Sequence, residues 1–103
     1  MNVKESAIQR KCQKIIRDYG GYCFKNNGNI YTEVGRPDII ACVNGKFIAI
    51  ETKRENHMNE LSTAQTIVGK QITKAGGIWI ATDNPDVVEA LMIKLVGDKN
   101  GLS

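Results

Sequence analysis

The sequence lacks the features that mark membrane and secreted proteins. Its apolar runs are far shorter than the roughly 20 residues that a membrane-spanning helix needs. Its first eleven residues are largely polar and charged, which does not fit a signal peptide. Internal repeats, low-complexity tracts and linkers are also missing. We therefore expect one domain over residues 1–103, with no membrane association.

Cysteine is scarce, with three residues at Cys12, Cys23 and Cys42. The count is odd and no two form a CxxC pair, which disfavours a disulfide or a metal site. Each cysteine lies in or beside an apolar run, so we expect all three to be buried, free thiols. Such thiols are typical of the reducing intracellular compartment, and we expect a cytoplasmic protein.

Excess charge is small as well. The net charge of +3 is compatible with a nucleic-acid partner without arguing for one. The apolar content of 42% is enough for a single small core. Because a chain of 103 residues buries a smaller fraction of its surface than a larger domain does, self-association would add buried area. These numbers are compatible with a homodimer.

Apolar residues recur instead with the periods of helices and short strands. Asn2 and Glu5 resemble a capping box at the start of the first helix, and Ser62 is a typical N-cap of the second. The resulting order α-β-β-β-α-β-α predicts an α/β protein. The expected elements cover residues 5–19, 22–24, 39–43, 46–50, 62–75, 78–81 and 84–95.

The two central apolar runs predict a β-hairpin, because Asn44-Gly45 between them is the dipeptide most typical of a two-residue turn. Both arms are apolar on both faces, so we expect the hairpin to lie in the middle of the sheet, covered on each side by helices. A crossover helix before the last strand makes the sheet mixed. That helix is expected to bury a stripe of Ala64, Ile67, Val68, Ile72 and Ala75.

The expected hairpin register brings two carboxylates together. If Val43 pairs with Lys46, paired positions sum to 89, and Asp38 then faces Glu51. Lys53 points to the same face as Glu51, because side chains alternate along a strand. Directly opposed Cβ atoms lie about 4.5–5.5 Å apart, and like charges there destabilise each other. A cation between the two carboxylates would remove that repulsion.

Two carboxylates at this separation suit Mg²⁺, which prefers oxygen ligands. Lys53 beside them can orient a water molecule or contact a phosphate. The alternative is an ordinary surface ion pair at the end of a hairpin, since Glu-x-Lys alone is a common spacing. The spacing by itself leaves both interpretations open.

Gly35-Arg36-Pro37-Asp38 followed by Glu51-Thr52-Lys53 resembles the PD-(D/E)xK nuclease signature, and the chain more closely resembles the virus-type replication-repair nuclease (VRR-NUC) domain. The likeness runs from Glu5-Ser6 through these motifs to residues 61–65 and Gly76-Gly77. It implies a restriction-endonuclease-like core and Mg²⁺- or Mn²⁺-dependent hydrolysis of DNA. Short members of the family resemble Holliday junction resolvases and act as homodimers, which implies branched DNA as substrate. The family name suggests viral or mobile-element ancestry and therefore a bacterial or phage-infected cell, and leaves host or phage origin open.

The resemblance also implies roles for individual residues. Asp38 and Glu51 would be metal ligands, with the backbone carbonyl of Thr52 as a third. Lys53 would position the attacking water and contact the scissile phosphate. Glu5 would belong to the site, although a capping-box contact with Asn2 is the alternative.

Gln65 matches a family glutamine that would hold the lysine or a phosphate, although from spacing alone it is an exposed helical residue. Arg36 would contact a phosphate beside the site. Arg10, Lys14 and Arg17 form a basic stripe on the first helix that would follow a DNA backbone, unless it is simply the solvated face of that helix.

Two further readings of the function compete with a structure-selective DNA endonuclease. A non-catalytic nucleic-acid-binding or scaffolding module would keep the fold and lose cutting, and the intact set of Asp38, Glu51 and Lys53 argues against it. The other competing interpretation is a small α/β interaction domain with an incidental ion pair. His57 is the single histidine and lies in a charged loop without an evident partner, so we expect no catalytic role for it.

Overall fold

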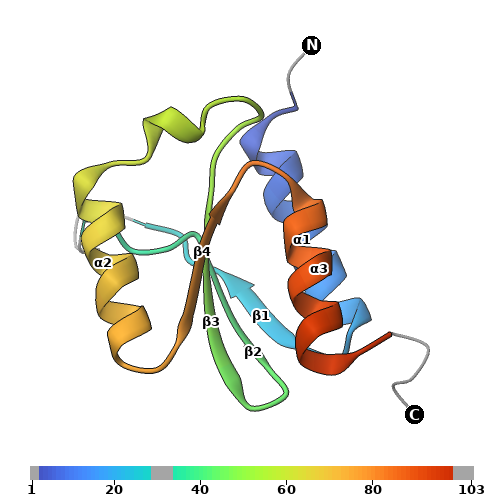
Figure 1. The fold of residues 1–103 in the computed structure, drawn as a ribbon. Helices are drawn as coiled ribbons and strands as arrows, with labels where there is room; N and C mark the ends of the chain where they lie inside the picture. Colours follow the sequence, from blue (N-terminus) through green and yellow to red (C-terminus); the bar gives the residue numbers. More distant parts are fainter. Residues whose placement is uncertain (1–2, 29–33, 99–103) are drawn as a thin grey trace.

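The computed structural model describes residues 3–28 and 34–98. Within them the helices and strands follow the order expected from the sequence (Figure 1). The elements are α1 (Glu5–Asp18), β1 (Tyr22–Lys25), β2 (Ile39–Val43), β3 (Lys46–Thr52), the 3-10 helix η1 (Met58–Glu60), α2 (Thr63–Lys74), β4 (Ile78–Thr82) and α3 (Pro85–Val96).

The hairpin forms as predicted. Asn44 and Gly45 both adopt positive φ angles, 51° and 75°, as a two-residue primed turn requires. Val43 pairs with Lys46, so the expected register holds along the ladder. The strands lie in the order β1-β2-β3-β4, with β1, β2 and β3 antiparallel and β4 parallel to β3. The mixed sheet with a central hairpin is therefore confirmed.

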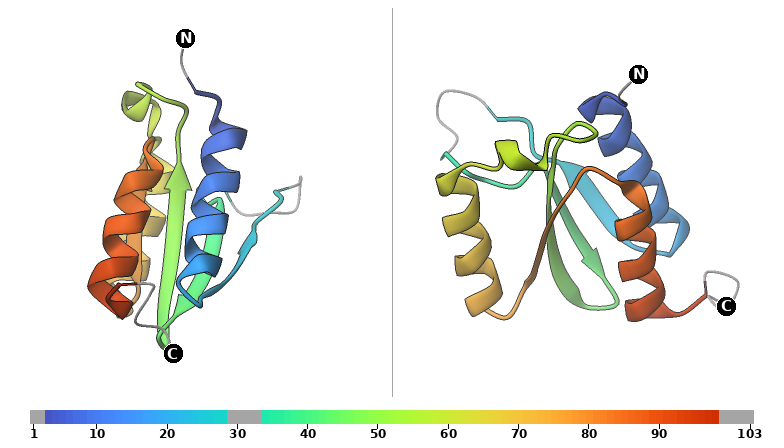
Figure 2. Two further views of the ribbon diagram at one scale, coloured as in Figure 1. Left: turned by 90° about the vertical axis from the view of Figure 1, so that its right-hand side faces the viewer. Right: turned by 45° about the horizontal axis from the view of Figure 1, so that its top comes forward.

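Helices pack on both faces of this sheet. Helices α1 and α3 lie side by side on one face and α2 lies on the other (Figure 2). The buried core lies between helices α1 and α3 and the side chains of the hairpin that face them, including Ile8, Ile16, Ile48, Ile50 and Met92. None of the described helices is both long and apolar enough to cross a membrane.

Local signals determine where the helices begin. Ser62 caps α2 through its hydroxyl, and the Gln65 side chain returns a bond to the Ser62 amide, which completes a capping box. Asn84 caps α3, ahead of Pro85 in the first turn. Helix α1 begins at Glu5 with Lys4 as its N-cap and no side-chain cap. Glu5 is thus the first helical residue, and Asn2 lies outside the described residues.

Coverage of the second sheet face is less complete than the apolar pattern predicted. Helix α2 packs against β4 and β3, and the outer face of β1 and β2 is left open. Phe47 of β3 remains 48% exposed on the same face, beside its partner Cys42, which is exposed rather than buried. Cys12 and Cys23 are buried free thiols, as expected.

The predicted apolar stripe of α2 is also wrong in part. Ile67 is 51% exposed and Ala75 is exposed, while Gly69 is the buried residue of this helix. The reason is tertiary: the indole of Trp79 lies against Gly69, where a Cβ would come within 2.4 Å of the ring. The helix packs on the sheet through a contact between the Trp79 ring and Gly69, which a hydropathy pattern does not reveal.

Candidate active site

Asp38 lies immediately before β2, half-buried at the end of the hairpin ladder. Its Oδ2 accepts two hydrogen bonds from Thr52, one from the backbone amide at 2.8 Å and one from the hydroxyl at 2.9 Å. These bonds tie the start of β2 to the end of β3 and hold the carboxylate in one orientation. Asp38 and β3 therefore meet where the register argument placed them.

A buried glutamine from α1 completes this arrangement. The Nε2 of Gln9 donates to the Thr52 hydroxyl at 2.9 Å, and that hydroxyl donates to Asp38. Sequence reasoning missed Gln9, which is 5% exposed. A signal was present, because Gln9 lies four residues after Glu5 and three before Cys12, within the buried stripe of the helix. A polar residue in that stripe needs a partner inside the protein.

Glu51 is the most deeply buried charged residue of the site, at 2% exposure. Its Oε2 accepts a hydrogen bond from Gln65 Nε2 at 2.7 Å. Its other oxygen, Oε1, is buried and has no hydrogen-bond partner among the described residues. A buried carboxylate oxygen without a donor is costly, and such atoms usually mark a bound ion, a water or a functional site.

The electrostatics of the site favour a bound cation. Burial raises the pKa of Glu51 to about 8, with a further contribution from the charge of Asp38. Lys53 acts in the opposite direction on the same pKa and only partly offsets the shift. A divalent cation beside Glu51 would oppose this shift and favour the ionised form of its carboxyl group.

The charges of Asp38 and Lys53 also act on Glu5, the first residue of α1. Partial burial and the charge of Asp38 raise its pKa, while Lys53 lowers it. Helix α1 therefore directs its first carboxylate towards the end of the hairpin. Glu5 of α1 therefore shares the electrostatic environment of Asp38, which precedes β2, and of Lys53, which follows β3.

Gln65 has two structural roles at once. Its Oε1 accepts from the Ser62 amide in the capping box at 2.8 Å, and its Nε2 donates to Glu51. The family resemblance implied a contact with the lysine or a phosphate, and the contact observed is with the carboxylate of Glu51. The N-terminal turn of α2 thereby orients a side chain of β3.

The chemistry of these donors fits an oxygen-preferring cation. Asp38 and Glu51 supply carboxylate oxygens, and the unpartnered Oε1 of Glu51 is available to a metal ion. Within residues 3–28 and 34–98 no three His, Cys, Asp or Glu side chains are grouped closely enough to hold a metal alone. The remaining ligands would have to be backbone carbonyls and water, as is usual for Mg²⁺.

Other predicted site residues lie farther away. Lys14 forms an ion pair with Asp18 at 2.8 Å, and Arg17 donates to the Gln13 side chain and the Cys23 carbonyl. Arg17 lies twelve residues beyond Glu5 in α1, about 18 Å along the helix axis. Arg10 is exposed on the same helix.

Arg36 and His57 occupy loops. Arg36 is exposed, two residues before Asp38. The Nδ1 of His57 lies 2.7 Å from the carbonyl oxygen of Glu55, within the loop that precedes α2. This loop is held by backbone bonds from Glu55 to Val3 and from Asn56 to the Asp83 carboxylate.

No family model and no curated protein sequence matches the chain. A solved structure described as a VRR_NUC domain is similar, with a TM-score of 0.73 and 19% sequence identity over 87% of this chain and 95% of the other. The chain has the VRR-NUC fold. At this identity the likeness establishes the architecture, which is the restriction-endonuclease-like one expected from the sequence.

Proposed function

We propose that the chain is a metal-dependent endonuclease that hydrolyses phosphodiester bonds in DNA, with Asp38, Glu51 and Lys53 as its catalytic set. The observation that carries the proposal is the buried, unpartnered Oε1 of Glu51 beside the Asp38 carboxylate. A purely structural carboxylate would be expected to have a donor on each oxygen. The VRR-NUC fold supports the same conclusion.

Mg²⁺ or Mn²⁺ would be held by Asp38, Glu51 and the backbone carbonyl of Thr52. When bound, such an ion supplies positive charge that lowers the pKa of the attacking water and offsets the charge on the scissile phosphate. The Asp38 carboxylate is preorganised for that role, because Thr52 fixes its orientation through two hydrogen bonds. Gln65 does the same for Glu51.

Lys53 would orient the attacking water and contact the scissile phosphate. It lies two residues after Glu51, immediately beyond the end of β3, and its charge lowers the pKa of both Glu51 and Glu5. Glu5 would act from the edge of the site through an ordered water molecule. Arg36 would hold a phosphate of the strand being cut, and the α1 residues Arg10, Lys14 and Arg17 would contact DNA farther from the cut.

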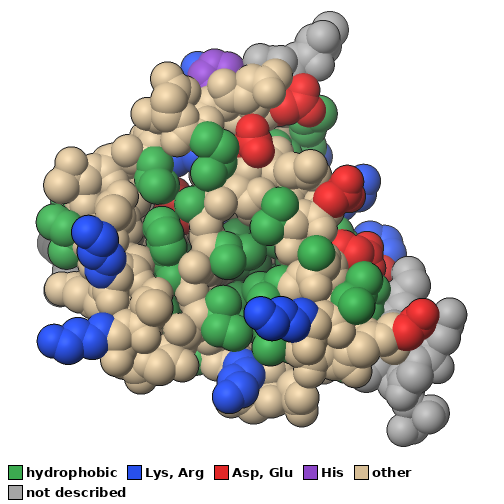
Figure 3. Space-filling model, in the orientation of Figure 1, with side chains coloured by type: hydrophobic (Ala, Val, Ile, Leu, Met, Phe, Trp, Pro, Cys, Tyr) green, Lys and Arg blue, Asp and Glu red, His purple; other side chains and the backbone are tan. Residues whose placement is uncertain are grey.

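We further propose branched DNA as the substrate and a homodimer as the active form. Each chain carries one set of Asp38, Glu51 and Lys53, so two symmetric cuts in a four-way junction would require two chains. Strand β4 supports self-association, because it is an edge of the sheet with the uncharged sequence Ile-Trp-Ile-Ala-Thr. Hydrophobic side chains gather over β4 between α2 and α3 (Figure 3).

The test is a cleavage assay on labelled four-way junctions, flaps, nicked duplex and single strands, with Mg²⁺, Mn²⁺ or EDTA. We expect metal-dependent cutting that is lost in Asp38→Asn and Lys53→Ala. Thr52→Val, which removes the hydroxyl donor to Asp38, should lower activity about 10–100-fold, and Thr52→Ser should restore it.

Matched controls are Asp86→Asn and Lys94→Ala, which change the same residue types on the exposed face of α3. Cutting that survives in EDTA or in Asp38→Asn would contradict the proposal. Tight DNA binding without cutting by the wild-type protein would favour the non-catalytic binding module instead.

A further inference from the structure

A groove on the open part of the sheet lies directly beside the candidate active site. It has a volume of about 440 Å³ and lies between β1 and β2 on one side and α2 on the other. Its lining includes Phe24, Phe47, Asn26, Arg36 and Gln71. A space of this size falls in the usual range for small-ligand sites, about 300–1,000 Å³.

The groove is continuous with the catalytic residues through the backbone. Pro37, which precedes Asp38, belongs to its lining. The Asn26 amide donates to the Asp38 carbonyl at 2.7 Å, and the Asn26 side chain donates to the Pro37 carbonyl at 3.2 Å. One wall of the groove is therefore tied to the residue that would bind the metal.

Exposed aromatic rings are concentrated on this face. Phe24 is 46% exposed, Phe47 is 48% exposed and Tyr22 is 70% exposed. The pairing of Tyr22 with Cys42, and of Cys42 with Phe47, places these side chains on the face of the sheet that α2 only partly covers. The rings of Tyr22 and Phe24 lie 6.3 Å apart, so they form a continuous aromatic surface leading out of the groove.

The polar groups in the groove favour nucleic acid over an apolar partner. Asn26 and Gln71 can bond base edges, and Arg36 carries positive charge. None of the nine residues that line the groove is acidic. A second groove, near the start of α3, is lined by Glu55 and Asp83 together with Lys11, so acidic residues outnumber basic ones there and the groove is less favourable for a phosphate backbone.

Aromatic rings on a sheet with nearby cations are a common platform for unpaired bases, because every base presents a flat π face. Bases in intact duplex are stacked on one another and cannot reach such rings. We propose that Phe24, Phe47 and Tyr22 stack the bases of an unpaired DNA strand next to the scissile bond. Among branched substrates, the site would then favour those in which a single-stranded segment adjoins the cut, such as flaps, a specificity that rests on the proposed nuclease function.

The binding test uses fluorescence anisotropy of the whole chain in EDTA, with a short labelled oligothymidylate and a blunt hairpin duplex as probes. We expect Phe24→Ala and Tyr22→Ala each to weaken oligothymidylate binding about tenfold while leaving duplex binding unchanged. Phe24→Tyr should bind as the wild type does. The control Ile67→Ala removes an equally exposed apolar side chain from α2, outside the groove, and should have no effect.

Crosslinking maps the same contact directly. A bromodeoxyuridine oligonucleotide should crosslink to the peptides that carry Tyr22, Phe24 or Phe47, and crosslinks confined to other peptides would overturn the proposal. If Phe24→Ala unfolds, the more exposed Tyr22 carries the binding test alone.

Three results would refute the stacking surface. The first is unchanged oligothymidylate binding in both alanine variants, and the second is an equal loss of binding to the single-stranded and duplex probes. The third is a change from dimer to monomer in the sedimentation of these variants, which would mark the face as a self-association surface. Cutting of branched DNA by the wild type together with the first of these would reject this inference alone. Aromatic-dependent binding without any cutting would reject the nuclease function and leave the stacking surface intact.

Discussion

At the scale of single residues, the site depends on carboxylates that are held by uncharged partners. Thr52 and Gln9 orient Asp38, and Gln65 orients Glu51. These partners direct the carboxylates without neutralising them, and the Oε1 of Glu51 is left without a donor. Such an arrangement is unfavourable in the metal-free protein and favourable once a cation is bound.

Substituting Glu51 should therefore stabilise the metal-free protein above neutral pH. The folded-state pKa of Glu51 is raised from 4.5 to about 8, so the folded protein binds this proton more tightly than the unfolded chain does. Its contribution to stability is complete below pH 4.5 and declines as the pH rises to about 8. Glu51→Gln removes that decline, and its amide can donate to Asp38.

The measurement is the free energy of unfolding by urea in EDTA, at pH 5 and pH 9. We expect Glu51→Gln to gain about 1 kcal/mol or more over the wild type at pH 9 relative to pH 5, since one pKa unit corresponds to about 1.4 kcal/mol. Added Mg²⁺ should reduce the difference by stabilising the wild type. Asp86→Asn is the control, and a difference that does not change with pH would argue against the raised pKa.

At the scale of elements, α2 links sheet packing to the site. Its N-terminal turn carries Gln65, which contacts Glu51, and its middle turn carries Gly69, which contacts Trp79. Any displacement of this helix from β4 therefore moves the hydrogen bond to the Glu51 carboxylate. Helix α1 provides the second link, through Gln9 and Glu5.

Gly69→Ala should lower both stability and activity. Alanine favours a helix by about 1 kcal/mol over glycine, yet its Cβ would lie 2.4 Å from the Trp79 ring, so α2 must shift outwards. We expect a lower urea midpoint and weaker cutting, measured on the same preparation. Lys70→Ala, on the exposed surface of the same helix, is the control. A second substitution, Trp79→Leu, should recover part of the loss, and no recovery would contradict the steric cause.

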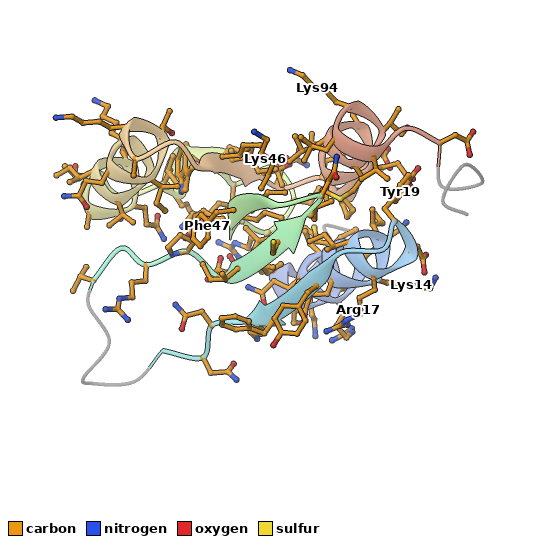
Figure 4. All side chains as sticks on the ribbon, turned by 90° about the horizontal axis from the view of Figure 1, so that it is seen from below. Lys14, Arg17, Tyr19, Lys46, Phe47 and Lys94 are labelled. Atoms are coloured by element: carbon orange, nitrogen blue, oxygen red, sulfur yellow. The ribbon has the colours of Figure 1, made fainter. Side chains whose placement is uncertain are left out.

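At the scale of the whole molecule, the sheet ends in two different edges. Strand β1 is one edge and carries the exposed Tyr22 and Phe24 next to the groove, whereas β4 is the other edge. The basic residues Lys14 and Arg17 lie on α1, away from Phe47 on β3 (Figure 4). The proposed DNA binding and the proposed self-association can therefore use different surfaces.

The proposed dimer is tested by sedimentation equilibrium. We expect the wild type to sediment as a dimer, and Val87→Glu to shift it towards monomer, because Val87 is a 44% exposed apolar residue in the first turn of α3, close to the end of β4. Ile67→Glu on α2 is the matched control. A wild type that stays monomeric at every concentration examined would reject the dimer.

The elements and the hairpin register could be predicted from the sequence because their causes are local. The Asn44-Gly45 turn sets the pairing, and strand alternation then aligns Glu51 with Lys53. Resemblance to nuclease motifs added Glu5 and Gln65, which the periodicity alone would have assigned to caps and solvent. The presence of a carboxylate pair at the hairpin end was therefore determined by the sequence.

Only the tertiary structure decided how that pair is held and what lies beside it. Gln9 reaches Thr52 across 43 positions of sequence, and Gly69 receives Trp79 because two distant elements meet there. Phe47 is exposed because α2 covers only part of this face of the sheet. The apolar pattern of the strands does not show how much of the face a helix will cover. Turns and strand periods depend on neighbours in the chain, whereas burial, orphaned oxygens and grooves depend on which faces pack together.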